Sequence, residues 1–479
     1  MGLKSWSTWV ARMVRSTCAS GSSPLQDPFM PQVRLPPGPQ GHFIAGNLVE
    51  FSEDPLGFLT RCAREYGDVV RLGKRNFLLN HPDLIERVLV NGDGNFVKLA
   101  GVGQGKRHKG GFPEAMMNSE GEDWLRKRRL VQPAFHRKHV AACGDTVVAL
   151  TETMLQTWRP GDARDVHADV SALALDIVSR FLFHTPIDDE AHHVAAAVDA
   201  VMRHTDSPLR PPIWVPTPTN LRLRRALGRL NTLLATLVRR YREQPESRTD
   251  LLALLLSAPV PLSEAQLRDE LATMIMSGHE TTADALVWAW YLLAQHPEAE
   301  ARLVEELETV LGGRLPGADD LPRLRYTEAV VKEAMRLYSP AWITSREALR
   351  DCELGGFHVP AGTMLAVSQW VTHRDARYFD APESFRPERW LSEDAQRMHR
   401  YVYFPFGGGP RFCIGSALAM IETVLITACV ARRFRLELAP GCVVRPRPAL
   451  ALQPLGVRLI PRHRSHKTQE GEVRHAAGA

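Results

Sequence analysis

The segment from Phe406 to Gly415, FGGGPRFCIG, combines a cysteine with the backbone freedom that a thiolate ligand needs. Glycines let the chain turn tightly around sulfur, and the helix that we expect to begin near Gly415 favours negative charge at its start. Arg411 adds a positive charge two residues before Cys413. The alternative for a single cysteine is a buried free thiol. The segment therefore indicates either a thiolate ligand at Cys413 or a packed thiol.

A second unusual segment interrupts the strongest helix pattern in the sequence. We expect a helix from Ser263, which forms a capping box with Gln266, to His296–Pro297, and its flanks are apolar on nearly every side. Its centre, SGHETT at residues 277–282, holds a glycine and two β-branched hydroxyl residues, which weaken a helix. Such a local violation often marks function. The alternative is that the threonines only bond to the preceding helical turn.

Two further pairs have helical spacing. Glu333 and Arg336 share one face of a predicted helix, where a surface ion pair is the ordinary interpretation. Trp124 and Arg128 share a face of the helix that we expect to begin near Glu120. Core packing for the tryptophan and a solvated face for the arginine are the alternatives. Neither pair alone indicates a function.

The order Phe406, Gly409, Arg411, Cys413, Gly415 resembles the cysteine-ligand loop of the cytochrome P450 family. A chance match in a chain of this length is on the order of one in ten thousand. The resemblance implies that Cys413 is the axial thiolate ligand of a heme b, whose electron donation favours O–O cleavage. It also implies that Phe406 and Gly415 contact this cofactor.

The resemblance extends to basic residues elsewhere in the chain. Trp124 and Arg128 are similar to the pair that holds a haem propionate in the family, and Arg346 and Arg411 match its other basic contacts. The fork of donors on arginine suits a carboxylate partner.

The weakened helix centre is similar to the oxygen-binding motif of the family. By this resemblance, Gly278 leaves room for dioxygen, Glu280 relays protons, and Thr281 holds a water molecule or the bound oxygen. Ser277 stands where alanine or glycine is more usual.

The resemblance also joins three residues into a structural triad. A glutamate and an arginine spaced like Glu333 and Arg336 pair in the family with an arginine of a later loop, which FRPERW at 385–390 matches. Arg389 is then the third member, and the triad holds the irregular chain behind the haem.

The implied fold class is mainly α, the cytochrome P450 fold: a triangular helical body with small β-sheets and a haem between the long central helix and the cysteine-ligand helix. We expect residues 1–35 to be a flexible extension, 36–461 a single domain and 462–479 a disordered tail. Two short strands are predicted in 68–80, and a hairpin joining the two sides of the turn at 360–362. Beyond Asp380, the pattern fits an ordered or a disordered loop equally.

Composition excludes several classes of protein. The net charge of +5 is scattered, which argues against nucleic-acid binding, and no run approaches the length of a membrane span. Seven cysteines without a CxxC pair favour a reducing compartment. The basic first 26 residues favour a disordered extension over a transit peptide or a surface anchor. We therefore expect a cytoplasmic monomer, with an organellar matrix or peripheral membrane contact as alternatives.

The resemblance implies a monooxygenase that inserts one atom of O2 into a lipophilic small molecule, such as a terpenoid, a fatty acid or another secondary metabolite. Electrons would come from a ferredoxin with its reductase or from a flavoprotein. Leu271–Ile275, Ala341–Thr344, a glycine-rich loop at 101–111 and a proline-rich lid at 206–220 are expected to face the substrate. The lid sequence WVPTPTN is similar to that of bacterial terpene oxygenases. The alternatives are a haem-containing gas sensor or carrier and a haem-free lipid-binding protein.

Overall fold

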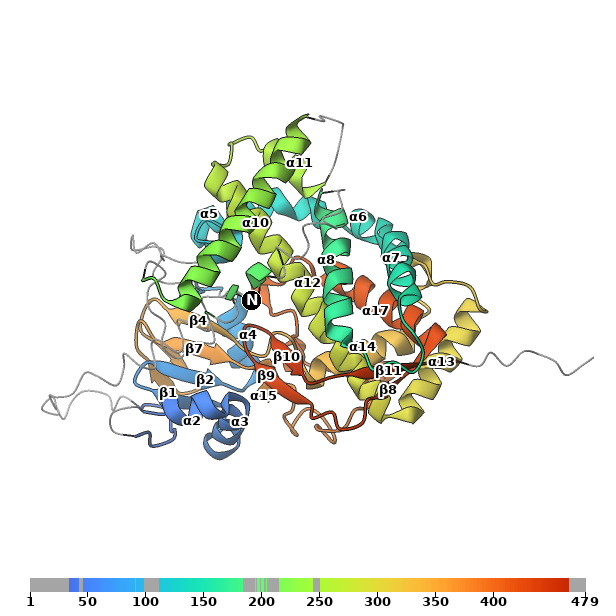
Figure 1. The fold of residues 1–479 in the computed structure, drawn as a ribbon. Helices are drawn as coiled ribbons and strands as arrows, with labels where there is room; N and C mark the ends of the chain where they lie inside the picture. The colour runs from blue at the N-terminus through green and yellow to red at the C-terminus, as the bar shows by residue number, and fades with distance from the viewer. Residues whose placement is uncertain are drawn as a thin grey trace, which may run out of the picture.

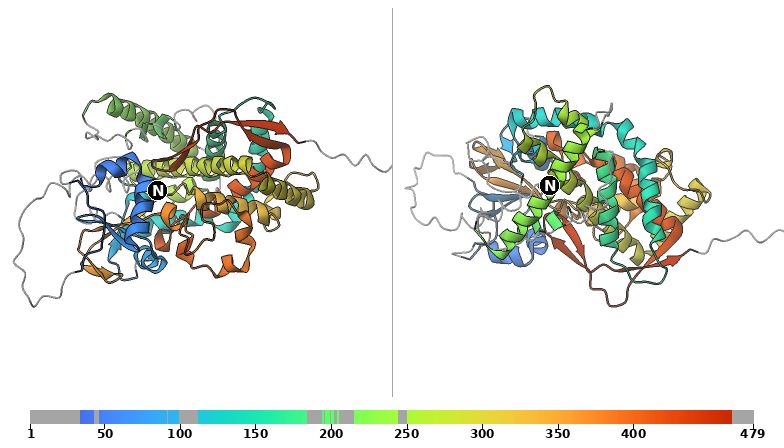
Figure 2. Two further views of the ribbon diagram at one scale, coloured as in Figure 1. Left: turned by 90° about the horizontal axis from the view of Figure 1, so that it is seen from below. Right: turned by 45° about the horizontal axis from the view of Figure 1, so that its top comes forward.

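The computed structural model describes residues 34–42, 46–90, 92–98, 112–183, 194, 196–198, 200, 201, 204, 215–243 and 250–464. Its longest helix, α12 (Glu264–Gln295), runs through the middle of the body (Figures 1 and 2). The Ser263 hydroxyl accepts a hydrogen bond from the Gln266 N–H, and the Gln266 side chain accepts one from Ser263. The predicted start, end and central position of this helix are confirmed.

Four long helices surround α12, because its apolar faces must be covered on several sides. They are α8 (Val166–Phe183), α10 (Pro218–Glu243), α14 (Arg325–Leu337) and α17 (Ser416–Arg433). The main apolar cluster joins α12, α8, α14 and α17 through fully buried side chains such as Leu286, Val330 and Leu425. The helix predicted to begin near Gly415 is α17, and Gly415 is its N-cap.

Shorter helices and single turns complete the helical part. They are α2 (Leu48–Glu53), α3 (Pro55–Tyr66), α4 (Pro82–Val90), α5 (Gly121–Val131), α6 (Arg137–Ala142), α7 (Gly144–Gln156), α11 (Leu251–Leu256), α13 (Pro297–Leu311), α15 (Gln369–Thr372) and α16 (Glu393–Arg397), with the turns η1 (Met116–Asn118), η2 (Gln132–Phe135), η3 (Ala318–Asp320), η4 (Pro387–Leu391), η5 (Arg400–Val402) and η6 (Gly409–Arg411). The described chain beyond Asp380, which extends to Arg464, is therefore ordered.

The largest sheet lies at one edge of the body and has the strand order β1-β2-β7-β4-β3 (Figure 1). The strands are β1 (Val69–Gly73), β2 (Asn76–Leu79), β3 (Phe96–Val97), β4 (Thr344–Ala348) and β7 (Met364–Val367). The predicted strands in 68–80 are confirmed as the antiparallel pair β1 and β2.

The predicted hairpin across the turn at 360–362 is wrong. The strand before the turn, β6 (Phe357–Val359), pairs with β5 (Cys352–Leu354), whereas β7 after the turn pairs with β2 and β4. The buried pattern of β7 suits a central strand between two neighbours, and local sequence alone does not reveal partners so distant along the chain.

Two hairpin-like pairs form the C-terminal part: β8 (Phe434–Leu438) with β11 (Leu459–His463), and β9 (Arg445–Pro448) with β10 (Leu452–Leu455). The second pair, the β9–β10 hairpin, is attached to the body by two tryptophans. Trp288 of α12 donates to Leu452 O at 2.8 Å, and Trp342 donates to Ala449 O at 2.9 Å. Strand β11 continues to His463, so residues 462 and 463 of the predicted tail lie in a strand.

Several predicted segments lie outside the described residues: 1–33 of the N-terminal extension, the glycine-rich loop at 101–111, residues 206–214 of the lid and the tail from 465. The end of the predicted irregular lid is helical, since α10 begins at Pro218. No helix among the described residues is long and apolar enough to cross a membrane.

Candidate active site

The loop that carries Cys413 is shaped by two glycines with positive φ, Gly407 (72°) and Gly409 (63°). A Cβ on Gly409 would lie 2.1 Å from Leu89 O, so a side chain there would collide with the backbone of α4. The Cys413 N–H donates to Phe406 O at 3.0 Å, which closes the loop. This arrangement holds the sulfur at the start of α17.

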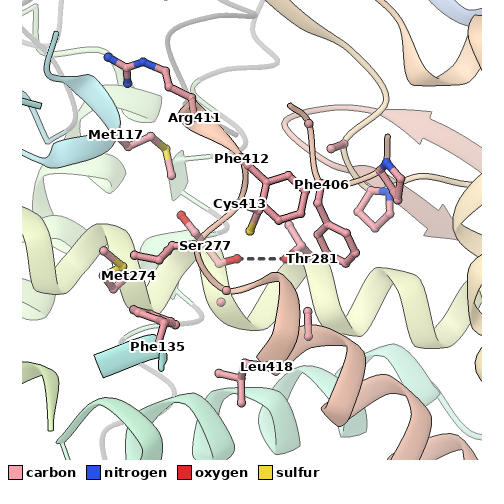
Figure 3. A pocket seen from close by; sticks show the side chains of 18 of the residues that line it. Met117, Phe135, Met274, Ser277, Thr281, Phe406, Arg411, Phe412, Cys413 and Leu418 are labelled. Atoms are coloured by element: carbon pink, nitrogen blue, oxygen red, sulfur yellow. Dashed lines mark hydrogen bonds between the residues drawn. The ribbon is translucent and has the colours of Figure 1, made fainter. Parts of the chain in front are cut away.

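The Cys413 sulfur faces a cavity of about 280 Å³, whose opposite wall is formed by α12 (Figure 3). The side chain is accessible from this cavity, although the residue lies deep within the protein. Burial raises the pKa of the thiol, while a hydrogen bond from Gly415 and the charge of Arg128 lower it. Phe406 and Gly415 also line the cavity.

Four cations line one side of this cavity: Lys98, Arg128, Arg346 and Arg411. Burial and the charges of Arg411 and Arg346 lower the pKa of Lys98 to about 7. Burial and the charge of Arg411 lower the pKa of Arg346 to about 10. These shifts show that the cations repel one another in a poorly solvated site.

Few of the described residues neutralise these cations. Arg411 pairs with Glu120 at 2.6 Å and lies over the Trp124 ring, 4.7 Å from its centroid. Among the described residues, Glu120 is the one carboxylate that forms an ion pair with any of the four. The guanidinium of Arg128 makes no hydrogen bond to the side chains or carbonyls of that same part of the chain. The chemistry of this wall therefore fits a ligand that carries carboxylates, as the propionates of a haem do.

Lys98 was not predicted from the sequence. It follows β3 directly, and its ammonium group donates to Met117 O at 3.1 Å. Lys98 does not belong to any helical or strand pattern in the sequence, so its spacing from other residues did not indicate a role.

The α12 wall of the cavity contains Ser277, Gly278 and Thr281. A Cβ on Gly278 would lie 2.7 Å from Val178 Cγ2, so the glycine also permits close packing of α12 on α8. The Thr281 hydroxyl donates to Ser277 O at 3.0 Å, as drawn in Figure 3. This is the back-bond that the sequence left as the alternative, and it leaves the Thr281 oxygen able to accept a hydrogen bond.

The neighbouring Thr282 connects α12 to α17. Its hydroxyl lies 3.1 Å from Gly278 O and 3.2 Å from Glu422 Oε2. Burial raises the pKa of Glu422 to about 8, against the effect of the Thr282 hydrogen bond. The buried carboxyl is thus easily protonated.

Glu280 does not line the cavity that contains Cys413. It lines a smaller adjoining cavity of about 50 Å³, whose wall it shares with Thr281. Its Oε1 accepts a hydrogen bond from Gln453 of β10 at 2.9 Å and lies 3.8 Å from His167 Nε2. Thr281 lines both cavities, as do Met117, Thr273 and Ser277, so these four residues form the wall between them.

His167 and Asp284 complete a buried polar group around Glu280. His167 Nε2 lies 3.0 Å from Asp284 Oδ1. Burial lowers the pKa of His167, but the hydrogen bond and charge of Asp284 and the charge of Glu280 outweigh it and raise this pKa to about 9. Burial and the charge of Glu280 raise the pKa of Asp284 to about 7. The group can therefore hold a proton near neutral pH.

Behind the loop, Glu333 receives hydrogen bonds from several sides. Arg336 donates to both carboxylate oxygens at 2.8 and 2.9 Å, and Arg389 donates to one at 2.9 Å. Trp390 adds a fourth bond, and the Arg336 guanidinium continues to the carbonyl of Pro382. The structure thus brings together the three residues expected to form the triad.

The predicted substrate-facing segments are only partly correct. Within Leu271–Ile275, Thr273 and Met274 line the main cavity, whereas Leu271 and Ile275 are packed in the core. Only one face of a helix can line a cavity. A prediction that names every residue of a continuous helical segment therefore also includes residues that face the core. Ala341 and Thr344 line the cavity, and so does Glu270, which the sequence did not indicate.

Comparison with known proteins gives a consistent result. A sequence model described as Cytochrome P450 matches residues 36–461. Cyclooctatin synthase of Streptomyces melanosporofaciens is 36% identical over 453 residues, which cover 92% of this chain and 98% of the relative. Cyclooctat-9-en-7-ol 5-monooxygenase of the same organism is 38% identical over 411 residues, which cover 83% of this chain and 88% of the relative. Pentalenene oxygenase of Streptomyces avermitilis is 33% identical over 414 residues, which cover 84% of this chain and 91% of the relative.

Proposed function

Because the chain belongs to the cytochrome P450 family and is a monooxygenase, we propose that it binds heme b through Cys413 and oxidises a terpenoid. The reaction consumes the substrate, O2, two electrons and two protons, and yields the oxygenated product and water. When bound, the haem iron supplies the activation of O2 and the transfer of one oxygen atom. Membership of an enzyme family sets aside the gas-carrier and lipid-binding alternatives.

The observation that carries this proposal is the arrangement of one cavity. The Cys413 sulfur lies on one side, the Ser277–Thr281 segment of α12 on another, and four cations at its edge. In this proposal Arg128, Arg346 and Arg411 hold the propionates, with Trp124 packed against Arg411. Lys98 is the further cation that we add to this set.

Proton transfer is assigned to Glu280 and Thr281, which both line the smaller cavity. Glu280 lies beside His167, whose side chain is 26% exposed and can exchange protons with solvent. The Thr281 oxygen can accept a hydrogen bond from water in either cavity. We propose that a proton passes from the Glu280 carboxyl through water to the neighbourhood of Thr281, where oxygen is activated.

A terpenoid substrate is supported by the relatives and by the cavity wall. The printed names of three relatives refer to cyclooctatin, cyclooctat-9-en-7-ol and pentalenene. The wall contains Met116, Met117, Val178, Leu182 and Met274, flexible or branched apolar side chains that fit a bulky hydrocarbon skeleton.

Members of the family generally take electrons from redox partners, and we propose a ferredoxin with its reductase or a flavoprotein as the donor here. Arg411 is a poor candidate for the docking surface, since its side chain is 14% exposed and paired with Glu120. Arg400 is exposed and lies over the ring of Phe412, 5.7 Å from its centroid, next to the cysteine. It suits an acidic partner better.

The test is a reconstituted reaction. The haem-loaded protein is first reduced under carbon monoxide, and a thiolate-ligated haem is expected to give its red-shifted band. The protein is then incubated with a ferredoxin, its reductase, NADPH and a panel of cyclic terpenes and fatty acids. Oxygenated terpenes are the expected products. Oxidation of fatty acids without any terpene product would contradict the proposed substrate class.

A further inference from the structure

One face of α12 carries polar side chains into an otherwise apolar part of the main cavity. Glu270, Thr273, Ser277 and Thr281 are spaced by three, four and four residues, which places them along one side of the helix. All four line the main cavity. Ser277 and Thr281 belong to the oxygen-binding segment, whereas Glu270 and Thr273 have no role in the proposed chemistry.

Glu270 is 1% exposed, and its two carboxylate oxygens have different environments. Oε1 accepts a hydrogen bond from the Met116 N–H at 2.7 Å, which fixes the side chain in place. Oε2 is buried and has no hydrogen-bond partner among the described residues. A buried polar atom without a partner costs free energy, so its retention in the wall of a cavity points to a ligand.

Thr273 presents a second unused group one helical turn away. It is 7% exposed, and its hydroxyl also has no partner within the described parts of the chain. Thr281 and Thr282, on the same helix, both bond back to the preceding turn, at 3.0 and 3.1 Å. Thr273 does not, so its hydroxyl can both donate to and accept from a molecule in the cavity.

Together, the two groups define the chemistry of their partner. A carboxylate oxygen accepts a hydrogen bond, and the threonine hydroxyl can donate one. An alcohol satisfies both, because its O–H donates and its oxygen accepts. An ether can only accept, an ammonium group can only donate, and a hydrocarbon can do neither. Around this polar pair, Met116, Val178 and Met274 require an apolar skeleton.

We propose that the substrate is a terpenoid alcohol whose hydroxyl group binds between Glu270 and Thr273. This assignment rests on the proposed function and narrows its substrate class. It also implies an earlier step, because a hydration or a hydroxylation must install the hydroxyl group before this enzyme acts. Along α12, Thr273 lies about 12 Å and Glu270 about 16 Å from Thr281. The carbon that is oxidised should therefore be remote from the hydroxyl, which suits a diterpene better than a smaller skeleton.

The test uses three diterpenes with one skeleton: dehydroabietinol, its methyl ether and the hydrocarbon dehydroabietane. Their dissociation constants from the haem-loaded protein are measured by calorimetry, so the readout does not depend on turnover. The alcohol is expected to bind about tenfold more tightly than the hydrocarbon, and the ether, which can accept from Thr273 but cannot donate to Glu270, between the two.

Two variants locate the effect. Thr273→Val, which is nearly isosteric, should reduce the preference for the alcohol several-fold, and Glu270→Met should remove most of it. Met274→Leu is the matched control, because it changes the apolar wall beside Thr273 and should affect all three ligands alike. Thr273→Val should also leave the melting temperature unchanged or higher, since no hydrogen bond is lost.

The possible failures are distinguishable. Equal binding of alcohol, ether and hydrocarbon would overturn the hydroxyl site and leave the terpenoid function standing. An alcohol preference that survives both variants would mean that Glu270 and Thr273 hold a resident water only, and would also overturn it. If none of the three ligands binds, the terpenoid proposal fails, and the hydroxyl site fails with it.

Discussion

At the scale of single residues, the environment of Cys413 favours a metal ligand over a packed thiol. Its sulfur is open to the cavity, whereas Cys429 is fully buried in the apolar core, where burial raises the thiol pKa to about 12. We expect Cys413→Ser to abolish the thiolate band in the carbon monoxide difference spectrum, because a neutral hydroxyl is a poor iron ligand. Cys442→Ser is the control and should keep the band. A wild-type band in Cys413→Ser would disprove the ligand assignment.

The Thr281 hydroxyl is predicted to act on proton delivery and not on folding. Thr281→Ala loses one back-bond to Ser277, which is worth about 1 kcal/mol, so haem content and the thiolate band should persist. The ratio of product formed to NADPH consumed should fall, by roughly tenfold, with hydrogen peroxide accounting for the missing electrons.

Thr282→Val is the matched control, since Thr282 makes the same back-bond but points to Glu422. An unchanged product ratio in Thr281→Ala would mean that this threonine only supports the helix.

Residue types and spacing were enough to single out the segments whose chemistry is local, and the family resemblance then chose between the alternatives for each. The cysteine loop and the helix centre each lie within ten residues, so their composition could be recognised directly. The sequence could not show that Lys98 joins three arginines, or that the hydroxyl of Thr273 lacks a partner. Both depend on contacts between segments that are far apart in the chain.

At the scale of elements, Glu333 and its partners join α14 to the loop before η4. Arg336→Leu should destabilise the fold by about 3–5 kcal/mol, because it leaves a buried carboxylate without its main partner. Arg389→Leu should cost less, since its side chain is 12% exposed. Thermal unfolding of the haem-loaded variants measures the order of these stability losses. Arg397→Leu on α16 is the control, because it removes an exposed ion pair. Equal losses in all three variants would contradict a buried triad.

Burial of Glu422, which contacts Thr282, makes the α12–α17 junction sensitive to pH. The pKa of Glu422 is raised from 4.5 to about 8 in the folded protein, so the folded state binds this proton more tightly than the unfolded state does. Its contribution to stability is complete below about pH 4.5 and is lost as the pH rises toward 8.

We therefore expect Glu422→Gln, which cannot ionise, to lose less stability than wild type between pH 6 and pH 8. The difference should not exceed about 1.4 kcal/mol per pH unit. Chemical unfolding at several pH values measures it, and parallel profiles for the two proteins would exclude this role of Glu422.

Elements were predictable where a local pattern determines them, as for α12 with its capping box. The pairing of β7 was not, because its partners β2 and β4 are determined by packing of the whole sheet. The triad of Glu333, Arg336 and Arg389 likewise depends on a partner that is distant along the chain. The spacing of Glu333 and Arg336 suggested a surface pair, and only the resemblance connected it to Arg389, more than fifty residues later.

At the scale of the whole molecule, the long described helices pack around α12, and members of the family generally take electrons from redox partners. Purified haem-loaded protein with NADPH and substrate should show no turnover, and addition of a ferredoxin with its reductase should restore it. Arg400→Glu should weaken the binding of an acidic ferredoxin. The ferredoxin concentration needed for a half-maximal rate should then rise several-fold. Turnover with NADPH and no partner would contradict this prediction.

The β9–β10 hairpin both lines the smaller cavity and holds the side chain of Glu280. The turn residues Leu450 and Ala451 form part of the wall of the smaller cavity, and Gln453 holds the carboxylate of Glu280. In recombination between relatives, exchange of this one hairpin would move both features at once. The shape of the smaller cavity and the efficiency of electron use should therefore be inherited together, and directed evolution of one at this hairpin should change the other with it.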